Sequence, residues 1–208
     1  MKGNSYTILY AVVMGVVCAV LLTGASEVLG PYKEANRKAE EMRNILQVLG
    51  VPVPEGASSR RLVEIYERNI RTVTLGELPA YRYVPADDPG GNVKAVAVPF
   101  SGPGLWGPIK GLLALDPSLQ TVRGIAFYEQ EETPGLGAEI AGADFRGQFV
   151  GKGLQYPDGR PGMLIKTGAK DASNGVDAIS GATMTCDKVQ AMLSDVIAKI
   201  VRARGTHG

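Results

Sequence analysis

A short segment near the C-terminus has residue types and spacing that suit covalent chemistry at a hydroxyl group. Residues 177–183 read Asp-Ala-Ile-Ser-Gly-Ala-Thr and precede an apolar-periodic stretch that predicts a helix. Thr183 offers a hydroxyl nucleophile, and the small residues Gly181 and Ala182 leave the backbone open to a bulky group. The amides at the start of the following helix would favour a phosphate at this position.

The same segment resembles the D-x-x-S/T-G-A-T acceptor site at which a flavin transferase attaches FMN to a threonine through a phosphodiester bond. Asp177 and Ser180 are suited to holding the turn through local hydrogen bonds between side chain and backbone. The alternative is purely structural, because a hydroxyl residue before a helix is an ordinary N-cap. We expect the last helix to run from residue 186 to about residue 204, with Thr185 as its N-cap.

Two further glycine-rich segments could form the walls of a flavin site. Residues 128–139 read Tyr-Glu-Gln-Glu-Glu-Thr-Pro-Gly-Leu-Gly-Ala-Glu and predict a stiff, close-approach loop after a strand. In residues 101–111 the only tryptophan, Trp106, lies between glycines and either packs locally or walls the flavin. The cofactor-binding residues predicted in these two segments are Glu132, Thr133, Gly135, Leu136 and Trp106. Those predicted at the acceptor are Asp177, Ser180, Gly181, Ala182, Thr183 and Thr185.

The elements around these segments predict an α+β domain with a mainly antiparallel sheet and flanking helices. Short β-rich runs lie at residues 70–75, 81–84, 93–99, 109–115, 121–128 and 163–167, separated by Gly, Pro and Asp turns. Helices are predicted at residues 32–49 and from residue 58 or 59 to about residue 69, with helical turns near residues 142–150.

The N-terminus predicts a membrane anchor. Residues 8–25 contain no charge, and eighteen helical residues extend roughly 27 Å, close to the thickness of a hydrocarbon core. A cleaved signal peptide is the alternative, since residues 23–25 read Thr-Gly-Ala; the length of the apolar run favours a retained anchor. We therefore divide the chain into an anchor at residues 1–28, a helical connector at 29–70 and a flavin-binding domain at 71–208.

Composition excludes several other functions. The chain has 22 basic and 21 acidic residues among 208, so no basic field indicates a nucleic-acid partner. Two cysteines and one histidine provide no ligand cluster for zinc or an iron–sulfur centre, so no metal site is predicted. His207 lies in a glycine-flanked tail, which argues against a Ser-His-Asp triad, and no side chain is predicted to be catalytic. No nucleotide-binding loop for NADH is visible.

The three segments, in this order behind one N-terminal anchor, resemble the FMN-binding subunits of two related membrane complexes. One is the C subunit of the Na⁺-translocating NADH:quinone oxidoreductase, and the other is the G subunit of the Rnf electron-transport complex. Residues 44–50, 104–106 and 145–149 are closer to the former, whereas the chain length is nearer to the latter. The resemblance covers most of the chain and leaves both families open.

The resemblance implies a single-pass protein of the inner membrane whose domain lies on the periplasmic side and carries FMN covalently on Thr183. It further implies other membrane subunits as partners, a flavin transferase during maturation, and electron relay within an ion-translocating oxidoreductase, with sodium transport if the Na⁺-translocating complex is the right one. This chain alone would have no complete activity. The alternatives are a stand-alone exported FMN-binding protein and an adaptor in which the acceptor segment is only a helix cap.

Overall fold

The computed structural model describes residues 2–205, so His207 lies outside the described residues. The chain forms two compact units, one up to Glu40 and one from Glu41 onward. The first helix, α1 (Lys2–Val48), includes both the predicted anchor and the predicted helix that follows it. Its segment Tyr6–Gly30 is long and apolar enough to cross a membrane, with a mean hydropathy of 2.4.

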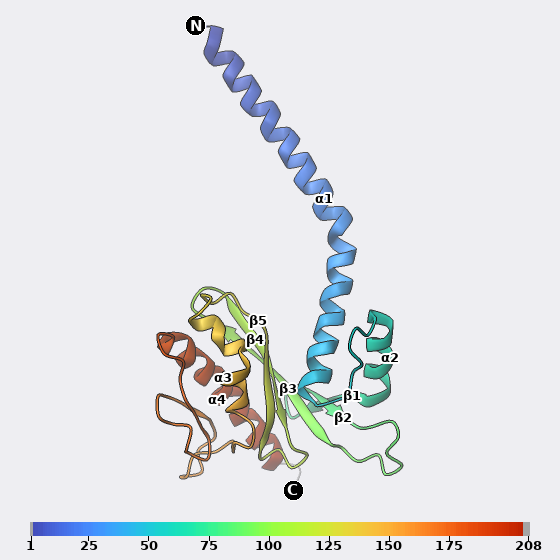
Figure 1. The fold of residues 1–208 in the computed structure, drawn as a ribbon, viewed down its shortest axis with the longest axis vertical. Helices are drawn as coiled ribbons and strands as arrows, with labels where there is room; N and C mark the ends of the chain where they lie inside the picture. Colours follow the sequence, from blue (N-terminus) through green and yellow to red (C-terminus); the bar gives the residue numbers. More distant parts are fainter. Residues whose placement is uncertain (1, 206–208) are drawn as a thin grey trace. The chain divides into compact units, whose positions relative to one another are not determined.

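The larger unit is built on a five-stranded antiparallel sheet whose strands follow one another in chain order (Figure 1). This arrangement confirms the predicted α+β class with an antiparallel sheet. Each strand neighbours the next along the chain because short turns can join only antiparallel partners. The strands are β1 (Ile70–Leu75), β2 (Leu78–Tyr83), β3 (Ala95–Pro103), β4 (Pro108–Leu115) and β5 (Val122–Glu129).

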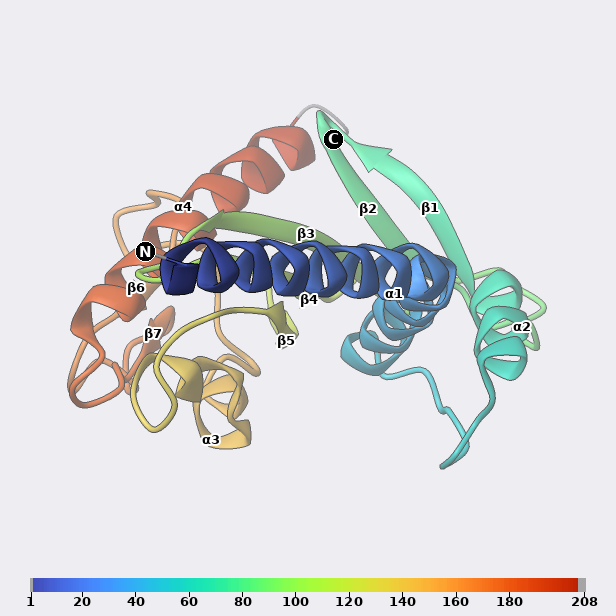
Figure 2. The same cartoon turned by 90° about the horizontal axis from the view of Figure 1, so that it is seen from above.

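Helices cover both faces of this sheet, which explains why its central strands are apolar along most of their length. Helix α4 (Thr183–Gly205) and helix α2 (Ser59–Asn69) lie on opposite sides in both views (Figures 1 and 2). In β4, Leu113 belongs to the core under α4, whereas its neighbour Leu112 belongs to the core under α2 and the end of α1. The alternation of side chains along a strand produces this division.

The amphipathic pattern of α4 attaches the acceptor segment firmly to the sheet. One face of α4 is buried, and each fully buried aliphatic side chain contributes about 1.5–3 kcal/mol. The buried residues are Thr185, Cys186, Val189, Met192, Leu193, Val196, Ile197, Ile200 and Ala203. The first turn of α4 is therefore held at a fixed place relative to the sheet.

The segment between β5 and α4 wraps around the end of the sheet with little regular structure. It contains a 3₁₀-helix η1 (Gly137–Ala141), helix α3 (Ala143–Gly147) and two short parallel strands, β6 (Leu164–Ile165) and β7 (Gly175–Val176). Phe145 packs edge-on against Phe149, with ring centroids 5.3 Å apart, and also contacts Phe127 of β5. These rings fix the wrap to the core.

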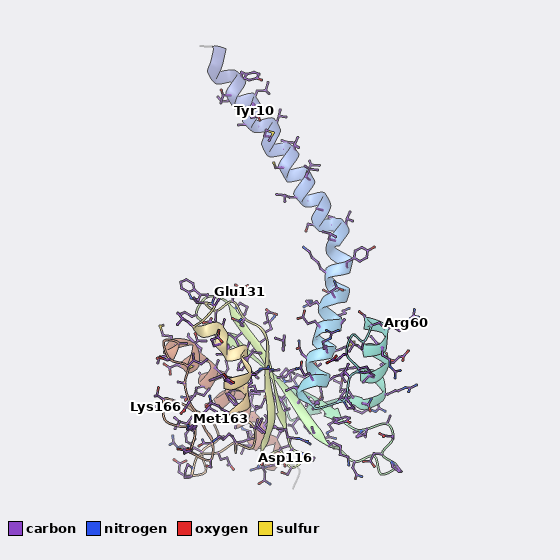
Figure 3. The ribbon with its side chains drawn as sticks, in the orientation of Figure 1. Tyr10, Arg60, Asp116, Glu131, Met163 and Lys166 are labelled. Atoms are coloured by element: carbon purple, nitrogen blue, oxygen red, sulfur yellow. The ribbon has the colours of Figure 1, made fainter. Side chains whose placement is uncertain are left out.

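Figure 3 shows Glu131 and Asp116 at opposite ends of the β4–β5 hairpin. At the Asp116 end, the carboxylate accepts hydrogen bonds from the amides of Ser118, Gln120 and Thr121 and from the Ser118 hydroxyl. Burial acts to raise the pKa of Asp116, but these hydrogen bonds outweigh it and hold the pKa below its usual range. At the Glu131 end, the loops that carry the candidate site begin.

Candidate functional site

The acceptor segment ends in a tight turn that leads directly into α4. Gly181 has a φ of +77°, a conformation that side-chain-bearing residues rarely adopt. The amide of Ala182 donates to the carbonyl of Ile179 at 3.1 Å, and α4 begins at the next residue, Thr183. The threonine side chain is exposed at this first helical position.

The prediction of Thr185 as the N-cap is wrong, because the helix begins at Thr183, three residues before the predicted start at residue 186. Thr185 lies inside the first turn of α4 and is only 2% exposed. Its hydroxyl donates to Glu132 Oε2 at 2.5 Å. The side chain therefore bonds to a distant loop and not to the helix backbone, and its hydroxyl is less accessible than that of Thr183.

The loop after β5 supplies the second wall of the site. Its backbone is compact, since the carbonyl of Thr133 accepts hydrogen bonds from the amides of Leu136 and Ala138, both at 3.1 Å. Gly135 has a φ of +74°, which permits this turn. The turn leaves Leu136 exposed beside Gly181. A Cβ added to Gly181 would lie 3.0 Å from Cδ2 of Leu136.

The β3–β4 turn supplies the third wall. The amide of Gly104 donates to the carbonyl of Gly107 at 2.8 Å, and this hydrogen bond closes the turn. Leu105 and Trp106 stand at its tip, and the tryptophan side chain is 71% exposed. Leu136 of the second wall is exposed as well, and a cluster of exposed apolar side chains is typical of a binding surface.

The three walls enclose a cavity of approximately 230 Å³. Most of the predicted site residues line this cavity, together with Leu105, Gly137 and Met184, which the sequence did not single out. The predicted residues at the cavity are Glu132, Thr133, Leu136, Gly181, Ala182, Thr183 and Thr185. The Gly-Leu-Gly sequence at residues 135–137 was the available signal for Gly137, whereas nothing in the sequence marks Met184.

The other predicted residues lie around the cavity. Trp106 lines an adjoining hollow that shares Leu105 with it. Ser180 and Gly135 lie in their respective turns, and both are exposed. Asp177 lines a separate hollow beside α3.

Asp177 anchors the start of the acceptor segment instead of facing the cavity. Its amide donates to Oε1 of Gln148 at 2.8 Å, and its Oδ1 accepts from the amide of Lys170 at 3.1 Å. The Asp177 side chain therefore bonds to backbone seven residues earlier in the chain, and this is not the local bond within the turn that the sequence predicted. These contacts fix the segment at its first residue, just as α4 fixes it at its last.

The start of α4 is the electropositive end of the helix dipole. The first-turn amides of a helix lack intrahelical partners and attract anions, and the first turn of α4 contains no acidic residue. Burial raises the pKa of the Cys186 thiol, whereas a hydrogen bond from the amide of Ile179 acts in the opposite direction. The cysteine is thus kept as a thiol and does not compete with Thr183 as a nucleophile.

Comparison with known proteins identifies the family. Residues 104–198 match the FMN-binding domain family, so the match contains all three walls of the cavity. The C subunit of the Na⁺-translocating NADH-quinone reductase of Pasteurella multocida is 30% identical, with 88% of this chain and 85% of that protein covered. The chain belongs to this C-subunit family. The corresponding protein of Neisseria meningitidis serogroup A is 29% identical over 89% of this chain and 86% of its own.

Solved structures of the same family have the same fold. The crystal structure of the C subunit from Parabacteroides distasonis is 26% identical, with a TM-score of 0.69 over 85% of this chain and 96% of its own. The crystal structure of the Shewanella oneidensis protein, 22% identical, gives the same TM-score over 83% and 98% of the two chains. The family resemblance drawn from the sequence is confirmed.

Proposed function

We propose that this chain is the FMN-carrying subunit of an ion-translocating NADH-quinone reductase and holds FMN covalently on Thr183. The observation that carries the proposal is the contrast between two threonines at the start of α4. Thr183 is exposed at the cavity, whereas Thr185 is buried and hydrogen-bonded to a carboxylate. Ser180 is also exposed but is not among the residues that line the cavity, so Thr183 is the accessible hydroxyl at the cavity, beside helix amides without intrahelical partners.

The residues around the cavity suit FMN in both charge and shape. The amides of the first turn of α4 would hold the phosphate, since helix N-termini favour anions. Exposed apolar side chains suited to the faces of a flat ring surround the cavity and its adjoining hollow: Leu105, Trp106, Leu136 and Met184. Stacking on such side chains contributes binding without requiring a deep pocket.

Attachment would use Thr183 as a nucleophile and a flavin transferase as the enzyme. The Thr183 Oγ1 forms an ester bond to the flavin-proximal phosphorus of FAD, the bond between the two phosphates breaks, and AMP leaves. The hydroxyl proton passes to a base of the transferase. Gly181 and Ala182 present no large side chain to a transferase that approaches the hydroxyl.

Bound FMN supplies electron transfer, and this chain supplies retention, orientation and a fixed electrostatic environment. We infer that electrons are relayed between partner membrane subunits that oxidise NADH and move the ion. The apolar segment Tyr6–Gly30 would anchor the chain in the inner membrane, with the flavin-binding domain on the periplasmic side. On that side a covalent bond prevents loss of the cofactor.

The proposal is tested by flavin fluorescence in denaturing gels of full-length protein made together with a flavin transferase. Thr183→Val removes the hydroxyl at nearly constant volume and is expected to abolish the fluorescent band. Thr183→Ser retains a hydroxyl and is expected to keep a band. A fluorescent Thr183→Val band would exclude this residue as the acceptor.

The place of the chain in a larger complex needs a separate experiment. When the full chain is affinity-purified from membranes of its native host, other membrane subunits of an NADH-quinone reductase are expected to co-purify with it. A flavin-loaded chain that purifies alone under mild detergent would indicate a stand-alone flavoprotein. A chain without flavin in cells with an active transferase would indicate an adaptor.

A further inference from the structure

Glu132 is a buried carboxylate at the point where the three walls of the cavity meet. It is 5% exposed and is the only charged side chain among the buried residues of the segment 41–205. A buried charge is costly unless it is paired or fully hydrogen-bonded. The position of Glu132 therefore requires a set of partners around it.

The carboxylate accepts hydrogen bonds from two other segments of the site. Its Oε1 accepts from the amides of Leu105 at 2.7 Å and Trp106 at 3.2 Å. Its Oε2 accepts from the Thr185 hydroxyl at 2.5 Å. The amide of Glu132 itself donates to Oε1 of Gln130 at 2.7 Å, which fixes the residue at its own loop.

Two glycines provide the space in which this carboxylate lies. A Cβ at Gly104 would be 2.5 Å from Glu132 Oε1, and a Cβ at Gly137 would be 2.8 Å from Oε2. Real Cβ contacts essentially never approach this closely. The carboxylate and the two glycines therefore fit together as one arrangement.

We infer that Glu132 is the positioning residue of the site, a clamp that holds the Trp106 loop and the first turn of α4 in fixed relation. The inference deepens the proposed function and rests on it. The relative position of the Trp106 loop and the first turn of α4 matters because FMN would lie between them. Both arms of the clamp are bonds to a charged acceptor, which are stronger than neutral hydrogen bonds. Glu132 acts through the loop and the helix and need not touch the flavin.

The first test measures the clamp without flavin. Hydrogen–deuterium exchange is followed by mass spectrometry on the full chain in detergent, in the Thr183→Val background. Glu132→Ala is expected to speed exchange of the amides of Leu105 and Trp106 about tenfold, because each loses its charged acceptor. Glu132→Gln should stay close to the parent, since an amide side chain can still accept hydrogen bonds from both backbone groups through its oxygen.

Two controls separate the clamp from general loosening. Glu77→Gln changes an exposed acid in the turn between β1 and β2 and should leave the exchange of residues 101–107 unchanged. Thr185→Val removes only the helix arm and should speed exchange of the Cys186 amide, which donates to the carbonyl of Ala182 at 3.0 Å, while the Trp106 loop stays protected. If Glu132→Ala fails to fold, the Thr185→Val result decides alone, because unchanged exchange of the Cys186 amide would overturn the helix arm of the clamp.

The second test uses the flavin-loaded chain with Thr183 intact. Glu132→Ala is expected to retain covalent flavin but to lose most of the visible circular dichroism of the bound ring, and Glu132→Gln should restore that signal. Unchanged exchange and unchanged dichroism in a folded Glu132→Ala protein would overturn the inference. Absence of flavin from the unmutated chain would instead overturn the proposed function and leave the exchange result standing.

Discussion

Gly137 offers a quantitative test of how tightly the site is packed. A Cβ at this position would lie 2.6 Å from the Thr185 Oγ1 and 2.8 Å from Glu132 Oε2. The glycine has an ordinary negative φ, since it is absent from the positive-φ glycines of the described chain. Gly137→Ala therefore changes packing at the junction and does not strain the backbone.

The cost of Gly137→Ala follows from two effects. Overpacking a well-filled site costs about 1–3 kcal/mol, and disrupting a hydrogen bond to a charged group costs about 1.5–3 kcal/mol. Removing a glycine returns roughly 0.5–1 kcal/mol through reduced chain entropy in the unfolded state. We expect a net loss of about 3 kcal/mol in the free energy of unfolding, or roughly 6–12 °C in Tm for a domain of this size.

The assay is thermal unfolding of the full chain in detergent, followed by the fluorescence of its single tryptophan and its tyrosines. Gly147→Ala is the matched control, since nothing lies within 4 Å of its added Cβ, and it should shift Tm by no more than about 2 °C. A Gly137→Ala protein with the Tm of the control would refute the close packing of Gly137, Glu132 and Thr185. Flavin loading of the same variant shows whether the junction also matters for function.

Three further predictions concern groups around the site and at the far end of the sheet. In a Cys18→Ser background, Cys186 should resist maleimide at pH 8 in the folded protein and react after unfolding, because it is buried and its pKa is raised; rapid native labelling would contradict this. Gln148→Ala should slow flavin loading by freeing the amide of Asp177, as measured by gel fluorescence over time; unchanged kinetics would show that Gln148 does not support the acceptor segment. Asp116→Asn should lower stability by about 1–2 kcal/mol at neutral pH through weaker hydrogen bonds. Because folding lowers the pKa of Asp116, its carboxylate stabilises the fold above the ordinary pKa of 3.8, and this stabilisation is lost as pH falls below that value. Denaturant melts should therefore show the free energies of unfolding of mutant and parent converging as the pH is lowered through that range. A difference that stays constant with pH would contradict the role given to the Asp116 carboxylate.

Local sequence patterns predicted most elements of the domain because residues close together in the chain determine where a strand or helix forms. The run at residues 70–75 matches β1, and Ser58 accepts a hydrogen bond from the amide of Arg61 as the N-cap of α2. The apolar face of α4 was likewise visible as a helical period. In each case the deciding contacts lie within a few residues along the chain.

Long-range contacts decided what the sequence could not predict. Thr185 has the residue type of a helix cap, but its hydroxyl bonds to Glu132, 53 residues earlier in the chain. The short strand β7 is missing from the predicted elements because two residues, Gly175 and Val176, carry no period and pair only with the distant β6. The motifs therefore indicated which segments form the site, whereas their relative placement depends on tertiary hydrogen bonds that no local pattern encodes.

The central claim is that FMN is bonded to Thr183, and peptide mapping by mass spectrometry tests it most directly. Full-length protein from membranes with its native flavin transferase is digested with trypsin, which should release residues 171–188 as one peptide whose hydroxyls are those of Ser173, Ser180, Thr183 and Thr185. We expect a mass gain equal to FMN less one water, with fragment ions that assign it to Thr183. An unmodified peptide, or flavin assigned to any of the other hydroxyls, would contradict the claim.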